Sequence, residues 1–315
     1  MQKIFIFPGQ GAQSLTMLNE LKGFSVNEIT SVFDIVSEAC KFNVMSFIEG
    51  ASKEMLGHTK YTQIVMFAMN LAYMKVLESL GIQADITAGH SLGQYCALVC
   101  AGILDLFETS CLISERSRLM SDLETKGSLC AVSSPKMSIE FIEQVCTKVS
   151  DELNDCIQIA LYNSNIQVVV GGTEVAIELF YQKMKGYSEY KLTILPVGQA
   201  FHTPIMKDML AAFKKYVDCI SIKKSDIPII LNCTGDYYRE KNNGDDLKNE
   251  LINQCYKPVQ WLQTMDTILK VEEPVIIEVG PGRSLAGMFR NLTKDVKVFC
   301  SEDKKSVMTL SKIVK

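Results

Sequence analysis

Residues 89–93 constrain this chain more than any other part of its sequence. They read GHSLG, which has the G-x-S-x-G spacing, and they lie between a strand-like segment, 81–87, and an apolar helix-like segment, 92–101. A serine on such a sharp strand-to-helix turn is a nucleophile elbow, whose glycines keep Cβ atoms out of the crowded bend. Backbone N–H groups at the start of the helix can then face an oxyanion. The stretch therefore predicts that Ser91 is a nucleophile.

Length and composition limit the class of protein. A chain of 315 residues exceeds the usual size of one hydrophobic core, so we expect a large domain and a smaller one. The hydrophobic content of 47% and the charged content of 22% are typical of a soluble globular protein. A formal net charge of −4 argues against a nucleic-acid partner. The most apolar helical segment, 61–80, contains Asn70, Lys75 and Glu78, which favours a core helix over a membrane span.

The 11 cysteines are scattered, mostly in apolar segments, and form no C-x-x-C pair. This pattern predicts reduced, buried thiols in a cytoplasmic enzyme. Because the first strand-like segment, 4–7, follows so closely on Met1, we expect no secretory signal. Only 3 histidines are present and no ligand-spaced cluster occurs, so we expect no metal site.

The middle of the chain changes pattern. Its predicted elements are strands at 128–132, 157–162, 167–170 and 191–195, and helices at 138–148 and 174–185. The order β-α-β-β-α-β matches a ferredoxin-like unit. Strands that alternate with helices on either side of it indicate an α/β large domain. We therefore predict a catalytic domain made of 1–124 and 198–315, with a small domain, 125–197, inserted in it.

The sequence also predicts the roles of two loops. The asparagines of 163–165, between the two central strands of the small domain, are expected to make turn hydrogen bonds. The hydrophilic segment 234–246, which follows a predicted buried strand at 227–232, is expected to be solvated surface.

A histidine is needed if Ser91 is to be deprotonated. His58 lies in a loop, and His90 shares the tight turn of the elbow, where neighbouring side chains diverge. His202 precedes a proline at a predicted helix start and is the best candidate for the general base.

Two further segments have both a plain and a functional interpretation. The loop 8–13 is either a simple strand-to-helix connection or a site where Gln10 or Gln13 donates a hydrogen bond to a ligand. Arg116 and Arg118 fall on different faces of a predicted helix at 106–123. Either both arginines are solvated, or one of them pairs with a substrate carboxylate.

Six motifs occur together and in order along the chain. They are FPGQGAQ at 7–13, GHSLGQY at 89–95, R-x-x-x-M at 116–120, AFH at 200–202, Q-x-x-x-P-V-x-W at 254–261 and E-x-G-P-G at 278–282. With them the chain resembles the malonyl-CoA:acyl carrier protein transacylase family, including free-standing acyltransferases of fatty-acid and trans-acyltransferase polyketide synthesis. The resemblance covers essentially the whole chain.

The resemblance implies an α/β-hydrolase-like large domain with a parallel central sheet, a ferredoxin-like small domain, and an active site in the cleft between them. Ser91 would attack the thioester of malonyl-CoA, with His202 as base, to form a malonyl-serine ester. The phosphopantetheine thiol of an acyl carrier protein would then take the malonyl group, which gives ping-pong kinetics. The resemblance implies no cofactor, a cytoplasmic enzyme, no membrane and a monomer.

The resemblance also implies roles for single residues. Gln10 and the backbone N–H of Leu92 would form the oxyanion hole, and the main-chain carbonyl of Gln254 would hold Nδ1–H of His202. Arg116 would pair with the free malonyl carboxylate. Met120 and Phe201 would also line the substrate site, and Phe201 would occupy the space that an α-methyl group needs.

Four positions depart from the family pattern: Ala12, Gln94, Ser117 and Gln199. None removes a catalytic group, but the last two leave the acyl specificity open, including an α-substituted malonyl carried on a protein. These departures favour polyketide over fatty-acid synthesis.

Two other functions remain as alternatives: a hydrolase that clears acyl groups from carrier proteins, against which Arg116 argues, and a catalytically idle scaffold. Because carrier proteins are acidic, a basic patch near the cleft is expected.

Overall fold

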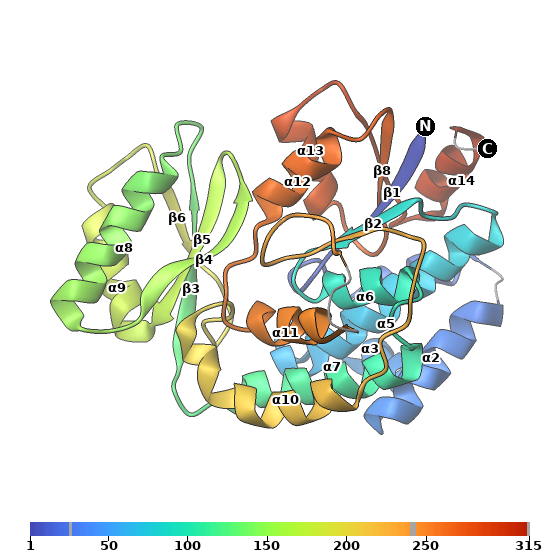
Figure 1. Cartoon of the computed structure of the whole chain (residues 1–315), viewed down its shortest axis with the longest axis horizontal. Coiled ribbons are helices and arrows are strands. Elements are labelled where there is room, and N and C mark those ends of the chain that lie inside the picture. The colour runs from blue at the N-terminus through green and yellow to red at the C-terminus, as the bar shows by residue number, and fades with distance from the viewer. Residues whose placement is uncertain (25–26, 240–243, 314–315) are drawn as a thin grey trace.

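The computed structural model describes residues 1–24, 27–239 and 244–313. Figure 1 shows two lobes side by side. The large lobe contains a five-stranded sheet with helices on both faces, and it holds both chain termini. The small lobe contains a four-stranded sheet with two helices on the side that faces away from the large lobe.

The five-stranded sheet has the order β7-β2-β1-β8-β9 and is parallel throughout. Its strands are β1 (Gln2–Phe7), β2 (Ile86–Gly89), β7 (Ile229–Ile230), β8 (Pro274–Glu278) and β9 (Lys297–Cys300). Residues 4–7 of the central strand β1 are fully buried and uniformly apolar, as in parallel sheets that are covered on both faces. This confirms the predicted α/β class with a parallel central sheet.

Alternate side chains of β1 enter two different cores. Phe5 and Phe7 pack in the core formed with α5 (Thr59–Ser79), α6 (Gly93–Cys100) and α7 (Leu106–Ser121). Ile4 and Ile6 pack on the other face, with side chains of α12 (Trp261–Leu269) and α13 (Ser284–Leu292). The segment predicted as a core helix at 61–80 is the buried helix α5. No helix in the described ranges is long and apolar enough to cross a membrane.

The small lobe has the predicted element order β-α-β-β-α-β. Its elements are β3 (Gly127–Ser133), α8 (Ile139–Leu153), β4 (Ile157–Ser164), β5 (Gln167–Thr173), α9 (Glu174–Met184) and β6 (Lys191–Ile194). The strands are antiparallel in the order β4-β5-β3-β6, and they share a separate core with α8 and α9. Backbone hydrogen bonds of 3.0 Å from Tyr162 to Val259 and from Val259 to Ala160 join this sheet to the large lobe.

The remaining helices belong to the large lobe. They are α1 (Met17–Leu21), α2 (Asn27–Cys40), α3 (Val44–Gly50), α4 (Lys53–Gly57), the 3₁₀ helix η1 (Pro204–Met209), α10 (Leu210–Cys219), α11 (Asp245–Gln254) and α14 (Lys304–Ile313). The prediction of a strand over 227–232 was too long, because only Ile229 and Ile230 join the sheet. Of the segment 234–246, predicted as loop, residues 240–243 lie outside the described residues, and α11 already begins at Asp245.

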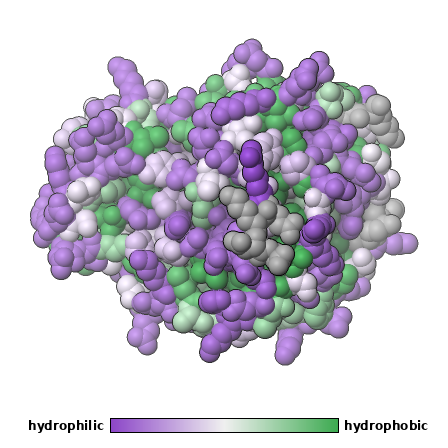
Figure 2. Space-filling model, viewed as in Figure 1, coloured by the Kyte–Doolittle hydropathy of each residue, from purple (hydrophilic) through white to green (hydrophobic). Residues whose placement is uncertain are grey.

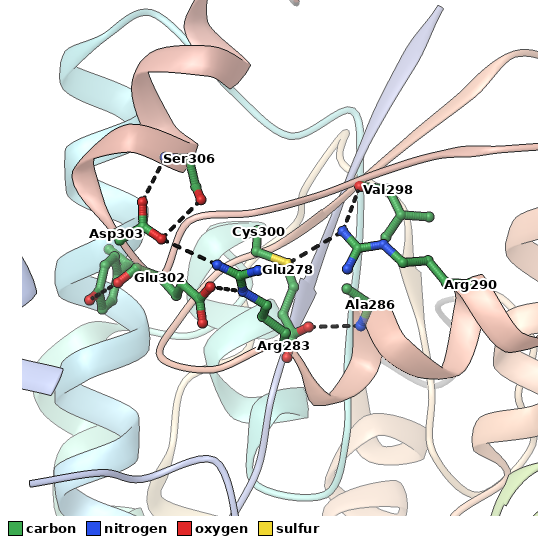
Figure 3. Close-up of polar contacts among 10 residues, drawn as sticks. Glu278, Arg283, Ala286, Arg290, Val298, Cys300, Glu302, Asp303 and Ser306 are labelled. Carbon is green, nitrogen blue, oxygen red and sulfur yellow. Dashed lines mark hydrogen bonds and ion pairs between the residues drawn. The ribbon is translucent and has the colours of Figure 1, made fainter. Parts of the chain in front are cut away.

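The strands β2 and β8 lie on either side of β1, and both end in turns that contain glycine. In the turn after β8, the side chain of the last strand residue binds the start of the next helix. Figure 3 shows Glu278, the last residue of β8, against the start of α13. Its carboxylate accepts hydrogen bonds from the N–H groups of Leu285, at 3.2 Å, and Ala286, at 2.7 Å. Burial raises the pKa of Glu278 to about 7. The E-x-G-P-G motif therefore caps a helix in this structure.

Candidate active site

The predicted strand, turn and helix are present around Ser91. Strand β2 ends at Gly89, α6 begins at Gly93, and Ser91 has a φ of 52°, in the left-handed region that non-glycine residues rarely adopt. A Cβ on Gly89 would overlap the backbone of Gly93, and one on Gly93 would overlap the carbonyl oxygen of Phe7. Only glycine fits at these two positions, which explains the G-x-S-x-G spacing.

His202 meets Ser91 from a segment 111 residues further along the chain. Its Nε2 lies 2.7 Å from Ser91 Oγ, and its Nδ1 lies 2.7 Å from the main-chain carbonyl oxygen of Gln254. A carbonyl oxygen can only accept, so Nδ1 carries the proton and the lone pair of Nε2 faces the serine hydroxyl. Burial, with the nearby Arg116 charge, lowers the pKa of His202 to about 3. A neutral imidazole in this position can act as a general base.

Arg116 lies on α7, is 1% exposed and stands above the ring of Tyr95. Its Nη1 donates to Gln63 Oε1, and its Nη2 donates to Gln254 Oε1 at 3.1 Å. Within the described ranges no carboxylate pairs with this guanidinium. A buried cation that lacks a protein counter-ion is costly, and an anionic ligand would offset that cost.

The other arginine of this helix has a different environment. Arg118 pairs at the surface with Glu115, at 2.8 Å, and with Asp122, at 3.3 Å. Of the two interpretations left open by the sequence, Arg118 is therefore the solvated arginine. Arg116 points into the site.

A cavity of about 200 Å³ brings the sequence-predicted residues together. It is lined by Gln10, Ser91, Leu92, Arg116, Met120, Phe201 and His202, with side chains of the small lobe on its other wall. Parallel pairing of Phe7 with Gly89 places the loop after β1 beside the elbow, which brings Gln10 into this cavity. The N–H of Leu92 is in the first turn of α6, where it has no acceptor within the helix.

Gln10 and Gln13 differ in what they bind. Gln10 Nε2 donates to Thr59 Oγ1 at 3.2 Å, so its amide is held at the edge of the cavity. Gln13 Oε1 instead accepts the N–H of Gly11 within its own loop, at 2.7 Å. In the described residues no group of three or more His, Cys, Asp or Glu side chains is placed to hold a metal ion.

Known proteins are similar to this chain in both sequence and fold. The family described as acyl transferase domain matches residues 4–309. The malonyl CoA-acyl carrier protein transacylase of Bacillus subtilis is 31% identical over 308 residues, which cover 98% of this chain and 96% of the relative. The chain belongs to the malonyl-CoA:acyl carrier protein transacylase family. It is an acyltransferase.

Solved structures of transacylases agree with this assignment. The crystal structure of the malonyl-CoA:acyl carrier protein transacylase from Xanthomonas oryzae pv. oryzae superposes with a TM-score of 0.91 at 27% identity, over 99% of this chain and 98% of that chain. A malonyl-transacylase solved in complex with a type II PKS acyl-carrier protein has a TM-score of 0.91 at 26% identity, over 99% and 100% of the two chains.

Several polar residues around the site of this acyltransferase were not predicted from sequence. Asn232 Oδ1 accepts the N–H of Ser91 at 2.7 Å, and Asn232 Nδ2 donates to the carbonyl of Gly89 at 2.6 Å. Gln63 holds Arg116, as described above. One signal was available for Asn232: a polar residue just past a buried strand at the carboxyl edge of a parallel sheet lies where ligands bind.

The prediction that Asn163 makes a turn hydrogen bond was incomplete, because the residue also bonds to the other lobe. It lies at the end of β4, and its Oδ1 is 2.9 Å from His90 Nε2 in the other lobe, while its Nδ2 donates to Gln167 Oε1 at 3.0 Å. The ring of His90 also packs edge-on against Trp261. His90 therefore contacts the small lobe, which agrees with the view that it is not the base.

Three of the departures from the family pattern make hydrogen bonds inside the transacylase fold, although Gln94 Nε2 and Gln199 Oε1 have no partner among the described residues. Gln94 Oε1 accepts the N–H of Asn232 at 2.6 Å. Ser117 Oγ donates to Ser114 in its own helix, and Gln199 Nε2 donates to the carbonyl of Leu123. None of the three is among the residues that line the cavity.

Proposed function

We propose that this protein transfers a malonyl group from malonyl-CoA to the phosphopantetheine thiol of an acyl carrier protein, by a ping-pong mechanism through a malonyl ester on Ser91. The observation that carries the proposal is Arg116, a buried cation in the same cavity as the Ser91–His202 pair. A malonyl group has a free carboxylate, which a guanidinium binds in bidentate geometry.

In the first half-reaction, Ser91 Oγ attacks the thioester carbonyl while His202 Nε2 accepts the hydroxyl proton. The carbonyl of Gln254 stabilises the resulting imidazolium through Nδ1–H, the place that an aspartate takes in a Ser-His-Asp triad. The N–H of Leu92 and the amide of Gln10 hold the oxyanion. Collapse of the tetrahedral intermediate breaks the C–S bond, and His202 returns the proton to the departing CoA sulfur.

In the second half-reaction, the carrier thiol gives its proton to His202 and attacks the malonyl ester. The C–O bond to Ser91 breaks, and the proton returns to Ser91 Oγ. Every proton and electron pair is supplied by the substrates, Ser91 and His202, so the reaction needs no cofactor.

Phe201 supports malonyl over methylmalonyl as the acyl group. Its side chain lines the cavity beside His202 and is 9% exposed, so it has little room to move aside. An α-methyl group would compete for the space that this ring fills.

The two lobes support the proposed division into a catalytic domain, 1–124 and 198–315, and a small domain, 125–197. Each lobe has its own sheet and its own core, and residues of both line the cavity. A carrier-bound arm would then enter between the domains. Figure 2 shows hydrophilic side chains spread over both lobes on the face that it draws.

We place the reaction in the cytoplasm and in the supply of malonyl units to a polyketide synthase. All 11 cysteines are free, which suits a reducing compartment. The similar transacylase in complex with a type II PKS acyl-carrier protein supports the polyketide setting. The monomeric state stays a prediction.

Intact-mass spectrometry tests the proposed function. The protein is incubated briefly with malonyl-CoA, acetyl-CoA or methylmalonyl-CoA, and a carrier protein is then added. We expect a single malonyl adduct that maps to Ser91 and moves to the carrier, with little adduct from the other two donors.

Other outcomes point to the alternatives. An adduct that is lost to water without loading of the carrier would indicate the hydrolase. No adduct from any CoA donor would favour a protein-borne donor or an idle scaffold. Adduct formation on a Ser91→Ala variant would place the nucleophile elsewhere.

A further inference from the structure

Gln254 touches the nucleophile, the base and the arginine at once. It is the last residue of α11 and is fully buried. Its main-chain carbonyl accepts from His202 Nδ1 at 2.7 Å, its Oε1 accepts from Arg116 Nη2 at 3.1 Å, and its Nε2 donates to the carbonyl of Ser91 at 2.9 Å. The first contact uses the backbone, so any residue could make it. The other two need the side-chain amide.

The chemistry of its partners fixes the orientation of this amide. A guanidinium only donates and a backbone carbonyl only accepts, so Oε1 must face Arg116 and Nε2 must face Ser91. The planar amide thus spans the space between the arginine and the elbow. Both polar atoms of the side chain are satisfied.

The elbow itself needs such support. Ser91 has a φ of 52°, which costs a non-glycine residue free energy unless its surroundings enforce it. Two side-chain amides hold its peptide groups: Asn232 accepts its N–H, and Gln254 binds its carbonyl. The two amides are also close to each other, with Gln254 Nε2 3.4 Å from Asn232 Oδ1.

We propose that the side chain of Gln254 is a positioning residue that couples recognition of the acyl carboxylate at Arg116 to the placement of Ser91. This inference rests on the proposed function. With the guanidinium and the elbow held at a fixed separation, a malonyl carboxylate bound to Arg116 sets its own thioester carbonyl against Ser91 Oγ. A small displacement of reacting atoms costs about 10²-fold in rate, so the coupling acts on kcat. An acetyl group has no carboxylate and gains nothing from it.

A Gln254→Met variant tests the coupling. Met has a similar length, keeps the main-chain carbonyl for His202 and removes both side-chain hydrogen bonds. We expect the kcat of malonyl transfer to fall about 10- to 100-fold and that of acetyl transfer about 3-fold or less. The pH profile should keep its shape, because the contact of His202 with the carbonyl remains. The matched control is Gln182→Met on the exposed surface of α9, which should leave both rates unchanged.

Combining Gln254→Met with Arg116→Ala shows whether the effect of Gln254 on malonyl transfer depends on Arg116. In an Arg116→Ala protein, Gln254→Met should not lower the malonyl-to-acetyl ratio further, since residues that act as one unit are not additive. Equal losses for both acyl groups would show that the side chain is merely structural and would overturn the proposal. Unchanged rates would overturn it as well.

Gln254→Asn provides a further test if the Gln254→Met protein does not fold. Gln254→Asn keeps the amide, but it is one methylene shorter and cannot reach both partners, so the ratio should fall here too. An unchanged ratio would overturn the proposal. If the wild-type protein forms a malonyl ester but the ratio is unaffected by any variant, only this inference fails. If the wild-type protein forms no such ester, the proposed function fails with it.

Discussion

The turns that follow β2 and β8 both connect a strand to a helix, but only the turn after β2 borders the cavity. Both strands pair with β1, one on each side, and both run through a glycine-containing turn into a helix. After β8, the carboxylate of Glu278 occupies the first N–H groups of α13. After β2, the strand ends in alanine and glycine, and the start of α6 opens onto the cavity beside Ser91.

A helix N-terminus can bind a ligand only where the chain leaves an N–H group without an acceptor of its own. Both turns stand out in the sequence, and both could face an anion. At α13 the chain supplies the hydrogen-bond acceptor itself, the buried carboxyl group of Glu278, so the position contributes to stability (Figure 3). At α6 the N–H groups of Gly93 and Gln94 bond to the carbonyls of His90 and Ser91, and the N–H of Leu92, which borders the cavity, is the one that we propose for the substrate oxyanion.

Gly93→Ala should destroy the elbow, whereas Gly282→Ala in the second turn should be tolerated. A Cβ at Gly93 overlaps the carbonyl oxygen of Phe7, so we expect a loss of about 4 kcal/mol or more, or no folded protein. At Gly282, with a φ of 81°, the added Cβ meets only ordinary contacts, and the cost should be about 1–2 kcal/mol. Urea unfolding of both variants measures the difference. Equal free energies of unfolding for the two variants would show that the two turns do not differ in their need for glycine.

Arg116→Ala should lower malonyl transfer about 10²- to 10³-fold and leave acetyl transfer unchanged or faster, because only malonyl has a carboxylate to pair. The kcat/KM values for the two CoA donors check this. Equal losses for both donors would mean that the arginine is structural.

Glu278→Gln should change stability and leave transfer intact. We expect a loss of about 1–3 kcal/mol in the free energy of unfolding at low pH, because an amide NH₂ group cannot accept a hydrogen bond from a helix N–H, whereas both oxygens of the carboxyl group can. Since burial raises the pKa of Glu278, the folded state binds its proton more tightly than the unfolded state does. The wild-type protein should therefore lose stability as pH rises from about 4.5 through about 7, and the variant should lack that slope. Thermal unfolding across this range checks it, and an unchanged slope would contradict the assignment.

The rate of Ser91 acylation should depend little on pH between about 5 and about 8. His202 must be neutral to act as base, and its pKa lies near 3, so protonation removes the base only as pH falls towards that value. The pH profile of kcat/KM checks this. A midpoint near 6.5 would show that His202 titrates as an exposed histidine does.

Much of the molecule could be predicted from sequence, because it follows from local pattern. The apolar run at 4–7, the glycines at 89 and 93 and the element order of the small lobe are each encoded within a few residues. The strand at 227–232 was predicted too long because the local pattern does not show which hydrogen bonds end it. The N–H of Leu231 bonds to Asp236 in the following turn, and that of Asn232 bonds to Gln94, so the ladder ends at Ile230.

The polar network around the site could not be predicted in the same way. Gln63, Asn232 and the side chain of Gln254 bind partners 53, 141 and 138 residues away. Amide side chains have no periodic signature, and a single asparagine fits a turn as well as a site. The second contact of Asn163 was missed for this reason, because its partner His90 lies in the other lobe.

Rapid-quench measurement of CoA release from malonyl-CoA, without a carrier protein, tests whether transfer passes through a malonyl ester on Ser91. If Ser91 forms an ester, CoA release should show a burst of about one CoA per enzyme, followed by slow hydrolysis, and Ser91→Ala should abolish the burst. Steady release without a burst, in a protein that still loads the carrier, would contradict the ester intermediate. A burst that persists in Ser91→Ala would contradict the assignment of the nucleophile.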